Sequence, residues 1–332
     1  MTDGNNPNEF AGARVLITGG LGFIGSNLAA KLVELGAEVT LIDTLVPEYG
    51  GNRFNIDPIR DRVTVNISDV RDTDSMRSII ADQQYLFNLA GQTSHMDSME
   101  DPYTDLAINC GAQLSILEAC RNYNPEIKVV FASTRQIYGK PAYLPVDEQH
   151  LVQPVDVNGI NKAAGEWYHI LYNNVYGVRS CALRLTNTYG PRMRVKDARQ
   201  TFVGIWVKLL LQGQPIEVWG GDQLRDFNYV DDVVDALLTC ARNDAAWGNV
   251  FNLGDSEIID LKSLAELMID VHGGGDYRVH EFPEERKKID IGDYYSDWQK
   301  IHQALGWQPQ TSLAAGMAHT FEHYRAHLDH YL

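Results

Sequence analysis

The feature that most constrains the fold is a glycine-rich turn near the amino end of the chain. Residues 18–26 read T-G-G-L-G-F-I-G-S and directly follow the apolar residues 15–17. A short strand, a glycine turn and a helix form the first unit of a dinucleotide-binding fold. Gly19 allows the tight turn, Gly22 lets the backbone approach a pyrophosphate, and Gly25 lets the helix pack closely on the strand. The diphosphate is then expected at the helix N-terminus, where unpaired N–H groups favour an anion.

An acidic residue at the end of the next strand strengthens this prediction. Residues 38–42 read E-V-T-L-I and are followed by Asp43. A carboxylate at that distance from the glycine turn accepts hydrogen bonds from both ribose hydroxyls. Because it would also repel a 2′-phosphate, the sequence predicts NAD as cofactor and disfavours NADP.

Composition excludes several classes of partner. The 332 residues are 44% hydrophobic, enough for two lobes or one large α/β domain. The formal net charge of -16 argues against nucleic acid or an anionic membrane surface. No apolar run is long enough to span a bilayer.

The four cysteines are scattered without a C-x-x-C pair, so we expect no metal site and no disulfide framework. Reduced thiols favour a cytoplasmic protein. We expect residues 1–12 to be a disordered lead-in, because the first ten lack the basic and apolar regions of a signal peptide.

Strand-like and helix-like segments alternate through the first half of the chain. The predicted strands are residues 15–18, 39–43, 63–66, 86–89, 128–133 and 179–185. The predicted helices are residues 26–35, 73–82, 104–123 and 159–176. This alternation predicts a parallel sheet with helices on both faces and a ligand at the carboxyl ends of the strands.

From about residue 187 the alternation becomes less regular, which indicates a smaller lobe covering the strand ends. The predicted fold class is α/β, a Rossmann doubly wound parallel sheet with a smaller C-terminal α/β substrate-binding lobe. We expect the NAD-binding domain to comprise residues 13–185 and about 227–255. The smaller, substrate-binding lobe is then about 186–226 and 256–330.

Further motifs follow the predicted strands: N-L-A-G at 88–91, S-T at 133–134 before Tyr138, and K-A-A-G-E at 162–166. R-L-T-N-T-Y-G-P-R at 184–192 and R-D-F-N-Y-V-D-D at 225–232 come later. From about residue 14 to 307 the chain resembles the extended short-chain dehydrogenase/reductases, specifically the NAD-dependent sugar-nucleotide epimerases and dehydratases such as UDP-glucose 4-epimerase-like members.

The resemblance implies a set of NAD contacts, with Asp69 and Val70 at the adenine. The implied cofactor-binding residues are Gly19, Gly22, Phe23, Ile24, Gly25, Asp43, Asp69, Val70, Leu89, Ala90, Gly91 and Lys162.

It also implies a mechanism in which NAD oxidises a sugar carbon and the hydride later returns. In this family a Tyr four residues before the Lys is the usual base, but here that position holds Asn158. An amide has no titratable proton near neutral pH and cannot be that base. The base is then Lys162, or else His95 or Asp156. Alternatively, the chain is an inactive variant, or it catalyses a reaction that needs a weaker base. A last alternative is that residue 158 is not the true counterpart of the family Tyr, although the K-A-A-G-E motif fixes the register.

Thr134 occupies the family position that hydrogen-bonds the reacting hydroxyl. In 4,6-dehydratases the next two residues are typically Asp and Glu, whereas here they are Arg135 and Gln136. Because neither can shuttle a proton as a carboxyl does, 4,6-dehydration is disfavoured.

Six residues are implied as substrate-binding: His95, Thr134, Asn187, Arg192, Arg225 and Arg286. The guanidinium fork suits diphosphate oxygens, although the run around Arg286 also fits a solvated surface. By the same resemblance, residues 104–123 and 159–176 are expected to form a homodimer interface.

The leading hypothesis is a cytoplasmic NAD-dependent epimerase acting at C4 of a hexose on UDP or a similar carrier. Thr134 and Lys162 are the expected catalytic residues, with Asn158 in the position of the usual base. The alternatives are a sugar-nucleotide decarboxylase or a different dehydratase, and a catalytically silent NAD- or nucleotide-binding protein.

Overall fold

A parallel sheet forms the centre of the larger lobe. The computed structural model describes residues 9–46, 49–197, 199, 201–282 and 291–332, and within them seven strands join in this sheet. In sheet order they are β11 (Val250–Asn252), β6 (Ser180–Leu185), β5 (Lys128–Thr134), β4 (Tyr85–Asn88), β1 (Arg14–Thr18), β2 (Glu38–Asp43) and β3 (Val63–Ile67). Every neighbouring pair runs parallel. The predicted Rossmann arrangement is confirmed.

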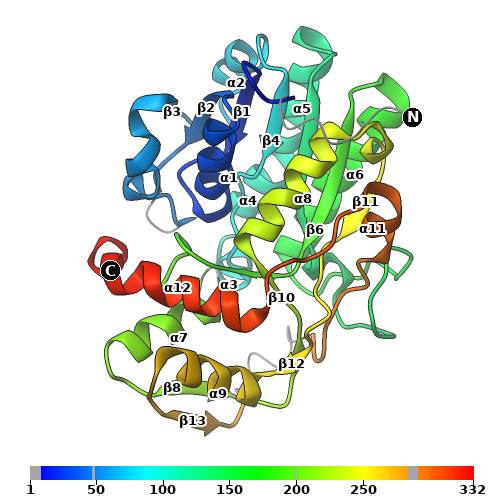
Figure 1. Cartoon of the computed structure of the whole chain (residues 1–332). Helices are drawn as coiled ribbons and strands as arrows, with labels where there is room; N and C mark the ends of the chain where they lie inside the picture. Colours follow the sequence, from blue (N-terminus) through cyan, green and yellow to red (C-terminus); the bar gives the residue numbers. More distant parts are fainter. Residues whose placement is uncertain (1–8, 47–48, 198, 200, 283–290) are drawn as a thin grey trace.

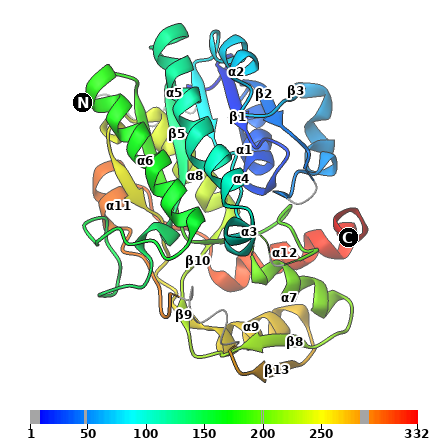
Figure 2. The same cartoon turned by 180° about the vertical axis from the view of Figure 1, so that it is seen from behind.

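Helices cover both faces of the sheet, which explains why its central strands are apolar along their length. The helices α1 (Phe23–Glu34) and α8 (Val230–Arg242) pack on one face (Figure 1). The helices α2 (Thr73–Ile80), α5 (Ala112–Tyr123) and α6 (Val157–Tyr176) pack on the other (Figure 2). Residues 15–17 of β1 are completely buried between the two layers.

The predicted helix 104–123 is interrupted. Asp101 caps α4 (Pro102–Leu106), and its carboxylate accepts a hydrogen bond from the Thr104 N–H. A π-helical turn, η3 (Ala107–Gly111), then leads into α5. The short helix α3 (His95–Glu100) precedes them, capped by Ser94, so three turns of helix gather beside the first turns of α6. Single π turns are often found at functional sites.

The smaller lobe has a core of its own, built around Trp206, Leu264 and Phe321. Its helices are α7 (Phe202–Leu211), α9 (Leu261–His272) and α12 (Leu313–His327). Its strands form three pairs: β7 (Asn187–Tyr189) with β10 (Phe227–Tyr229), β8 (Ile216–Trp219) with β13 (Tyr277–His280), and β9 (Leu224–Arg225) with β12 (Ile259–Asp260). Short 3₁₀ segments complete the described chain: η2 (Arg53–Arg62), η4 (Arg135–Tyr138), η5 (Asp244–Ala246) and η6 (Leu328–Tyr331).

Two segments differ from the sequence-based expectation. Residues 9–12 are not a disordered lead-in, because Phe10 is buried in the larger core and packs against Tyr85. Residues 1–8 lie outside the described part of the chain. The helix α11 (Gln299–Leu305) lies against the larger core and not the smaller one, because Ile301 and Trp307 pack there and the Trp307 indole donates to the Asp232 carbonyl at 3.1 Å.

Among the described helices, none combines the length and apolar character that crossing a membrane requires.

Candidate active site

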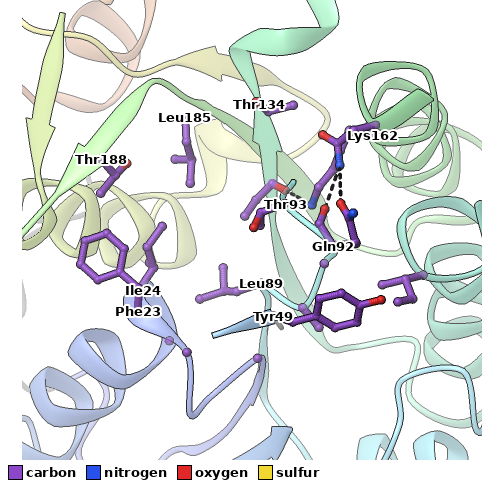
Figure 3. A pocket seen from close by; sticks show the side chains of 18 of the residues that line it. Phe23, Ile24, Tyr49, Leu89, Gln92, Thr93, Thr134, Lys162, Leu185 and Thr188 are labelled. Atoms are coloured by element: carbon purple, nitrogen blue, oxygen red, sulfur yellow. Dashed lines mark hydrogen bonds between the residues drawn. The ribbon is translucent and has the colours of Figure 1, made fainter. Parts of the chain in front are cut away.

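A cleft of about 520 Å³ runs along the carboxyl ends of the strands, between the two lobes. Figure 3 shows Phe23 and Ile24 of α1 across this cavity from Lys162 of α6. It brings together most of the site residues expected from the sequence: Gly19, Gly22, Phe23, Ile24, Gly25, Asp43, Asp69, Val70, Leu89, Ala90, Gly91, His95, Thr134, Asn158, Lys162, Asn187 and Arg225.

The glycine turn at one end of the cleft is sterically constrained. Gly19 has a φ of 70°, where a side chain is strained. A Cβ on Gly25 would lie 2.2 Å from the Gly19 carbonyl oxygen, so only glycine lets α1 approach β1 this closely. The N-cap of α1 is Gly22, which has no side chain to cover the N–H groups of the first turn. This turn fits a diphosphate.

Asp43 is held in place at the end of β2. One carboxylate oxygen accepts the Leu21 N–H at 3.0 Å and the other accepts the Leu45 N–H at 2.9 Å. Burial raises the pKa of the Asp43 carboxyl above its ordinary value, against the opposing effect of these backbone hydrogen bonds. The carboxylate lines the cleft one strand away from the glycine turn, which fits a ribose without a 2′-phosphate. Further along, Arg71 pairs with Asp69 at 2.6 Å and holds the pKa of that carboxyl low.

The turn after β4 is fixed by a single hydroxyl. Thr18 Oγ1 accepts the N–H groups of Leu89 and Ala90 at 3.0 and 3.1 Å and donates to Asn88 Oδ1. A Cβ on Gly91 would meet Lys162 Nζ at 3.0 Å. The small residues of this turn therefore bring the backbone close to the lysine.

Lys162 is buried on α6, and its Nζ donates to the Ala132 carbonyl at 3.0 Å. Burial lowers the pKa of Lys162 from 10.5 to about 8, although the negative charge of Asp105 opposes this shift. Thr134 ends β5 and lines the cleft, and its Oγ1 accepts the Gln136 N–H at 3.2 Å.

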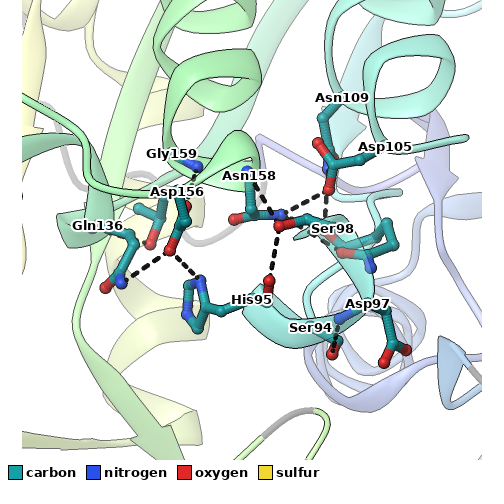
Figure 4. Close-up of polar contacts among 12 residues, drawn as sticks. Ser94, His95, Asp97, Ser98, Asp105, Asn109, Gln136, Asp156, Asn158 and Gly159 are labelled. Carbon is teal, nitrogen blue, oxygen red and sulfur yellow. Dashed lines mark hydrogen bonds and ion pairs between the residues drawn. The ribbon is translucent and has the colours of Figure 1, made fainter. Parts of the chain in front are cut away.

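Asn158 is 3% exposed and its amide is occupied by other groups. Its Nδ2 donates to the Gln92 carbonyl at 2.8 Å and to Asp105 Oδ2 at 3.1 Å. The Asn158 N–H donates to Ser98 Oγ at 3.3 Å (Figure 4). The residue in the position of the usual base is thus part of a buried polar cluster.

Asp105 is the centre of that cluster. Its carboxylate is completely buried and accepts amide hydrogens from Asn158, Asn109 and Asn161 at 3.1, 3.0 and 2.7 Å. Burying a charge requires this kind of compensation. Sequence reasoning missed Asp105, Asn161 and Gln92. The three-residue spacing of the two α6 asparagines, which puts them on one helix face, was an available signal.

A second polar pair lies beside this cluster. His95 Nδ1 is 2.9 Å from Asp156 Oδ2, and His95 lines the cleft. Asp156 also caps α6 through the Gly159 N–H at 2.6 Å and accepts Gln136 Nε2 at 3.1 Å. Burial raises the pKa of the Asp156 carboxyl, but the contacts with His95, Gly159 and Gln136 outweigh burial, and the net pKa is lowered. The carboxyl is therefore ionised at neutral pH.

The predicted diphosphate-binding residues have different positions. Asn187 lines the cleft, but Nδ2 donates to the Asp226 carbonyl at 2.9 Å and Oδ1 accepts from Arg135 at 3.0 Å. Arg225 also lines the cleft, although it is 8% exposed and Nη1 donates to the Leu224 carbonyl at 2.8 Å.

The prediction for Arg192 is corrected. Its guanidinium does not line the cleft and donates instead to Asn27 Oδ1 on α1 at 2.8 Å. The backbone of Arg192 has a φ of 72°. Arg286 lies outside the described residues.

Comparisons with known proteins agree with this geometry. Residues 15–254 match the family described as NAD dependent epimerase/dehydratase. A putative UDP-glucose 4-epimerase from Methanocaldococcus jannaschii is 35% identical over 307 residues, which cover 91% of this chain and 95% of that protein. The fold is similar to UDP-glucose 4-epimerase from Thermotoga maritima with UDP-glucose, at a TM-score of 0.86, 30% identity and coverage of 95% and 99%. It is also similar to the UDP-glucose 4-epimerase of Thermus thermophilus in complex with NAD, at a TM-score of 0.83, 29% identity and coverage of 94% and 99%.

Proposed function

The chain belongs to the NAD-dependent epimerase/dehydratase family, and on this premise we propose that it is an epimerase acting at C4 of a hexose carried on UDP. NAD is its cofactor, and when bound it accepts a hydride from a sugar carbon and returns it. The observation that carries the proposal is that Thr134 and Lys162 line the same cavity as the glycine turn and Asp43.

Each side chain has a distinct role in this proposal. Thr134 would hydrogen-bond the reacting hydroxyl, and Lys162 would hold the ribose and place a positive charge beside it. Asn187 and Arg225 would contact the diphosphate from the smaller lobe.

The side chains after Thr134 favour epimerisation over dehydration. Gln136 bonds Asp156, and Arg135 bonds Asn187 and lies 5.0 Å from the Tyr294 ring centre. Neither residue can deliver and remove a proton across a carbon–carbon bond, as 4,6-dehydration requires.

Product analysis tests the proposal. The protein is incubated with NAD and UDP-, dTDP-, GDP- or CDP-hexoses in D₂O, and products are identified by mass spectrometry and proton NMR. An isomer of unchanged mass without deuterium supports hydride-based epimerisation. Loss of water or carbon dioxide would assign a dehydratase or decarboxylase, and binding without any product would assign a catalytically silent protein.

We also propose that the enzyme works as a cytoplasmic homodimer. Four side chains at seven- and four-residue spacing form an exposed apolar stripe on α6: Ile160, Trp167, Leu171 and Val175. Exposed stripes of this kind mark interaction surfaces. The four cysteines are unpaired, which suits a reducing compartment. Light scattering should give the mass of two chains, and Trp167→Glu should give the mass of one. A wild-type mass of one chain at micromolar concentration would contradict the dimer.

A further inference from the structure

The buried cluster around Asp105 excludes Asn158 from proton transfer and leaves the reaction without its usual base. Both amide hydrogens of Asn158 are engaged, by the Gln92 carbonyl and by Asp105. We propose that His95, oriented by Asp156, is the group that takes the proton from the sugar hydroxyl and returns it. This inference rests on the proposed function and names the acid/base residue that the proposed function lacks.

The two partners of this pair have complementary environments. The Asp156 side chain is completely buried, whereas 39% of the His95 side chain is exposed and the residue lines the cleft. A histidine base whose ring is oriented by a buried carboxylate recurs in catalytic sites. The 2.9 Å contact is not aligned as a hydrogen bond in this structure, and such alignment often improves only when substrate binds.

The carboxylate determines which ring nitrogen can act. Asp156 Oδ2 favours a proton on Nδ1 of His95, and the second nitrogen, Nε2, is then an acceptor with a free lone pair. Imidazole is also the side chain best suited to accept and return a proton near neutral pH. Oxidation would break the hydroxyl O–H bond, with its proton moving to Nε2. The adjacent C–H bond would break, NAD would accept the hydride, and C=O would form. In the return step the hydride would add to the opposite face of the ketone, while Nε2 gives the proton back to its oxygen.

The backbone around His95 is tied to α6. Ser98 Oγ donates to the His95 carbonyl at 2.7 Å and accepts the Asn158 N–H, as Figure 4 shows. Ser94 Oγ caps α3 by accepting the Asp97 N–H at 3.1 Å. The main chain of α6 at residue 158 therefore holds α3 in place, and with it the imidazole.

Lys162 is the competing candidate for the base. Its Nζ already donates to the Ala132 carbonyl at 3.0 Å, which requires an N–H and favours the charged form. Burial lowers the pKa of Lys162 to about 8, so most of the lysine carries a proton at pH 7. Its geometry suits holding the cofactor and stabilising negative charge.

The test compares His95→Gln with His280→Gln. His280 is a matched control, because it also pairs with a carboxylate, Glu217, and is similarly exposed on the smaller lobe. His95→Gln should lower kcat by about 10²–10⁴-fold, while the affinities for NAD and UDP-glucose, measured by calorimetry, stay within about threefold. His280→Gln should keep the wild-type kcat. Added imidazole should restore part of the kcat of His95→Ala.

Asp156→Asn isolates the orienting role. Asn caps a helix about as well as Asp, so α6 should remain folded, and thermal denaturation checks this. The amide would favour the wrong tautomer, and kcat should fall by at least about tenfold. In ¹⁵N NMR of the unliganded protein, the His95 proton should move from Nδ1 toward Nε2, a readout independent of turnover.

The outcomes separate the two proposals. If the wild-type protein converts no sugar nucleotide, the proposed function fails, and the role of His95 fails with it. If the wild type converts substrate but folded His95→Gln loses less than about tenfold in kcat, the inference alone is overturned. The same holds if the wild-type His95 proton resides on Nε2.

Discussion

Replacing Asn158 with Asp exchanges one amide for a carboxylate of the same shape next to Asp105 in the buried cluster. In the native protein Asn158 Nδ2 is 3.1 Å from Asp105 Oδ2. Two unit charges at that distance repel by about 5 kcal/mol at an effective dielectric constant of about 20. Taking up a proton is less costly: neutralising an aspartate at pH 7 costs about 4 kcal/mol, from 1.36 kcal/mol per unit above an ordinary pKa of about 3.9. The protonated group can also donate to the Gln92 carbonyl, as the amide does.

The free energy of unfolding should therefore fall by about 4 kcal/mol at pH 7 but only about 1.5 kcal/mol at pH 5. The sign follows because the folded variant holds a proton that the unfolded chain releases, so the loss grows as pH rises from about 4 toward 7. Urea denaturation followed by circular dichroism measures both values. Asn243→Asp is the control, since Asn243 caps η5 and a carboxylate is tolerated there. A loss at pH 7 below about 1 kcal/mol, or one independent of pH, would refute this account of the cluster.

Three further changes test the cofactor half of the cleft. Gly25→Ala should weaken NAD binding and lower the melting temperature, because the new Cβ would sit 2.2 Å from the Gly19 carbonyl oxygen; calorimetry and thermal scans measure this, and an unchanged affinity would contradict it. Asp43→Asn should weaken NAD binding by about tenfold or more, the cost of one charge-assisted hydrogen bond; titration with NAD and NADP measures the affinity ratio, and an unchanged ratio would count against the carboxylate's role. Lys162→Met should lose turnover, and the stability of the wild type relative to this variant should rise between about pH 8 and 10.5, where the folded chain has released the lysine proton and the unfolded chain still keeps it. Because the folded pKa lies below the unfolded one, burial of the charged lysine costs stability at pH 7, and this cost shrinks as pH rises through that interval. A flat difference in urea denaturation over that interval would contradict the burial of a charged Lys162.

The cofactor half of the site follows from local sequence, and this explains why it could be predicted. Gly19, Gly25 and Asp43 lie on consecutive elements, and their roles depend on backbone geometry that a strand–turn–helix pattern determines. The position of Asn158 four residues before Lys162 is also local, because both residues lie on α6.

The substrate half depends on contacts between segments that are distant in the sequence, and the spacing of apolar residues does not predict such contacts. Arg192 turns toward α1 because Asn27, far earlier in the chain, offers an oxygen at 2.8 Å. Asp105 is buried only because α4 and α6 meet, and nothing local distinguishes it from a surface aspartate. Local sequence likewise does not separate Phe10 from a disordered lead-in, because its contact with Tyr85 joins two distant segments.

The larger core cannot be completed early in translation, because some of its residues come late in the sequence. The edge strand β11 follows the segment from β7 to β10, which belongs to the smaller lobe. Ile301 and Trp307 come later still, and both pack in the larger core. A nascent chain emerging from the ribosome therefore lacks these pieces of the dinucleotide-binding half until residues 301 and 307 have been translated. Truncation shortly after α9 should leave β11 without its contacts to α11. A chimera that takes the smaller lobe from a relative must replace several segments that are separated in the sequence.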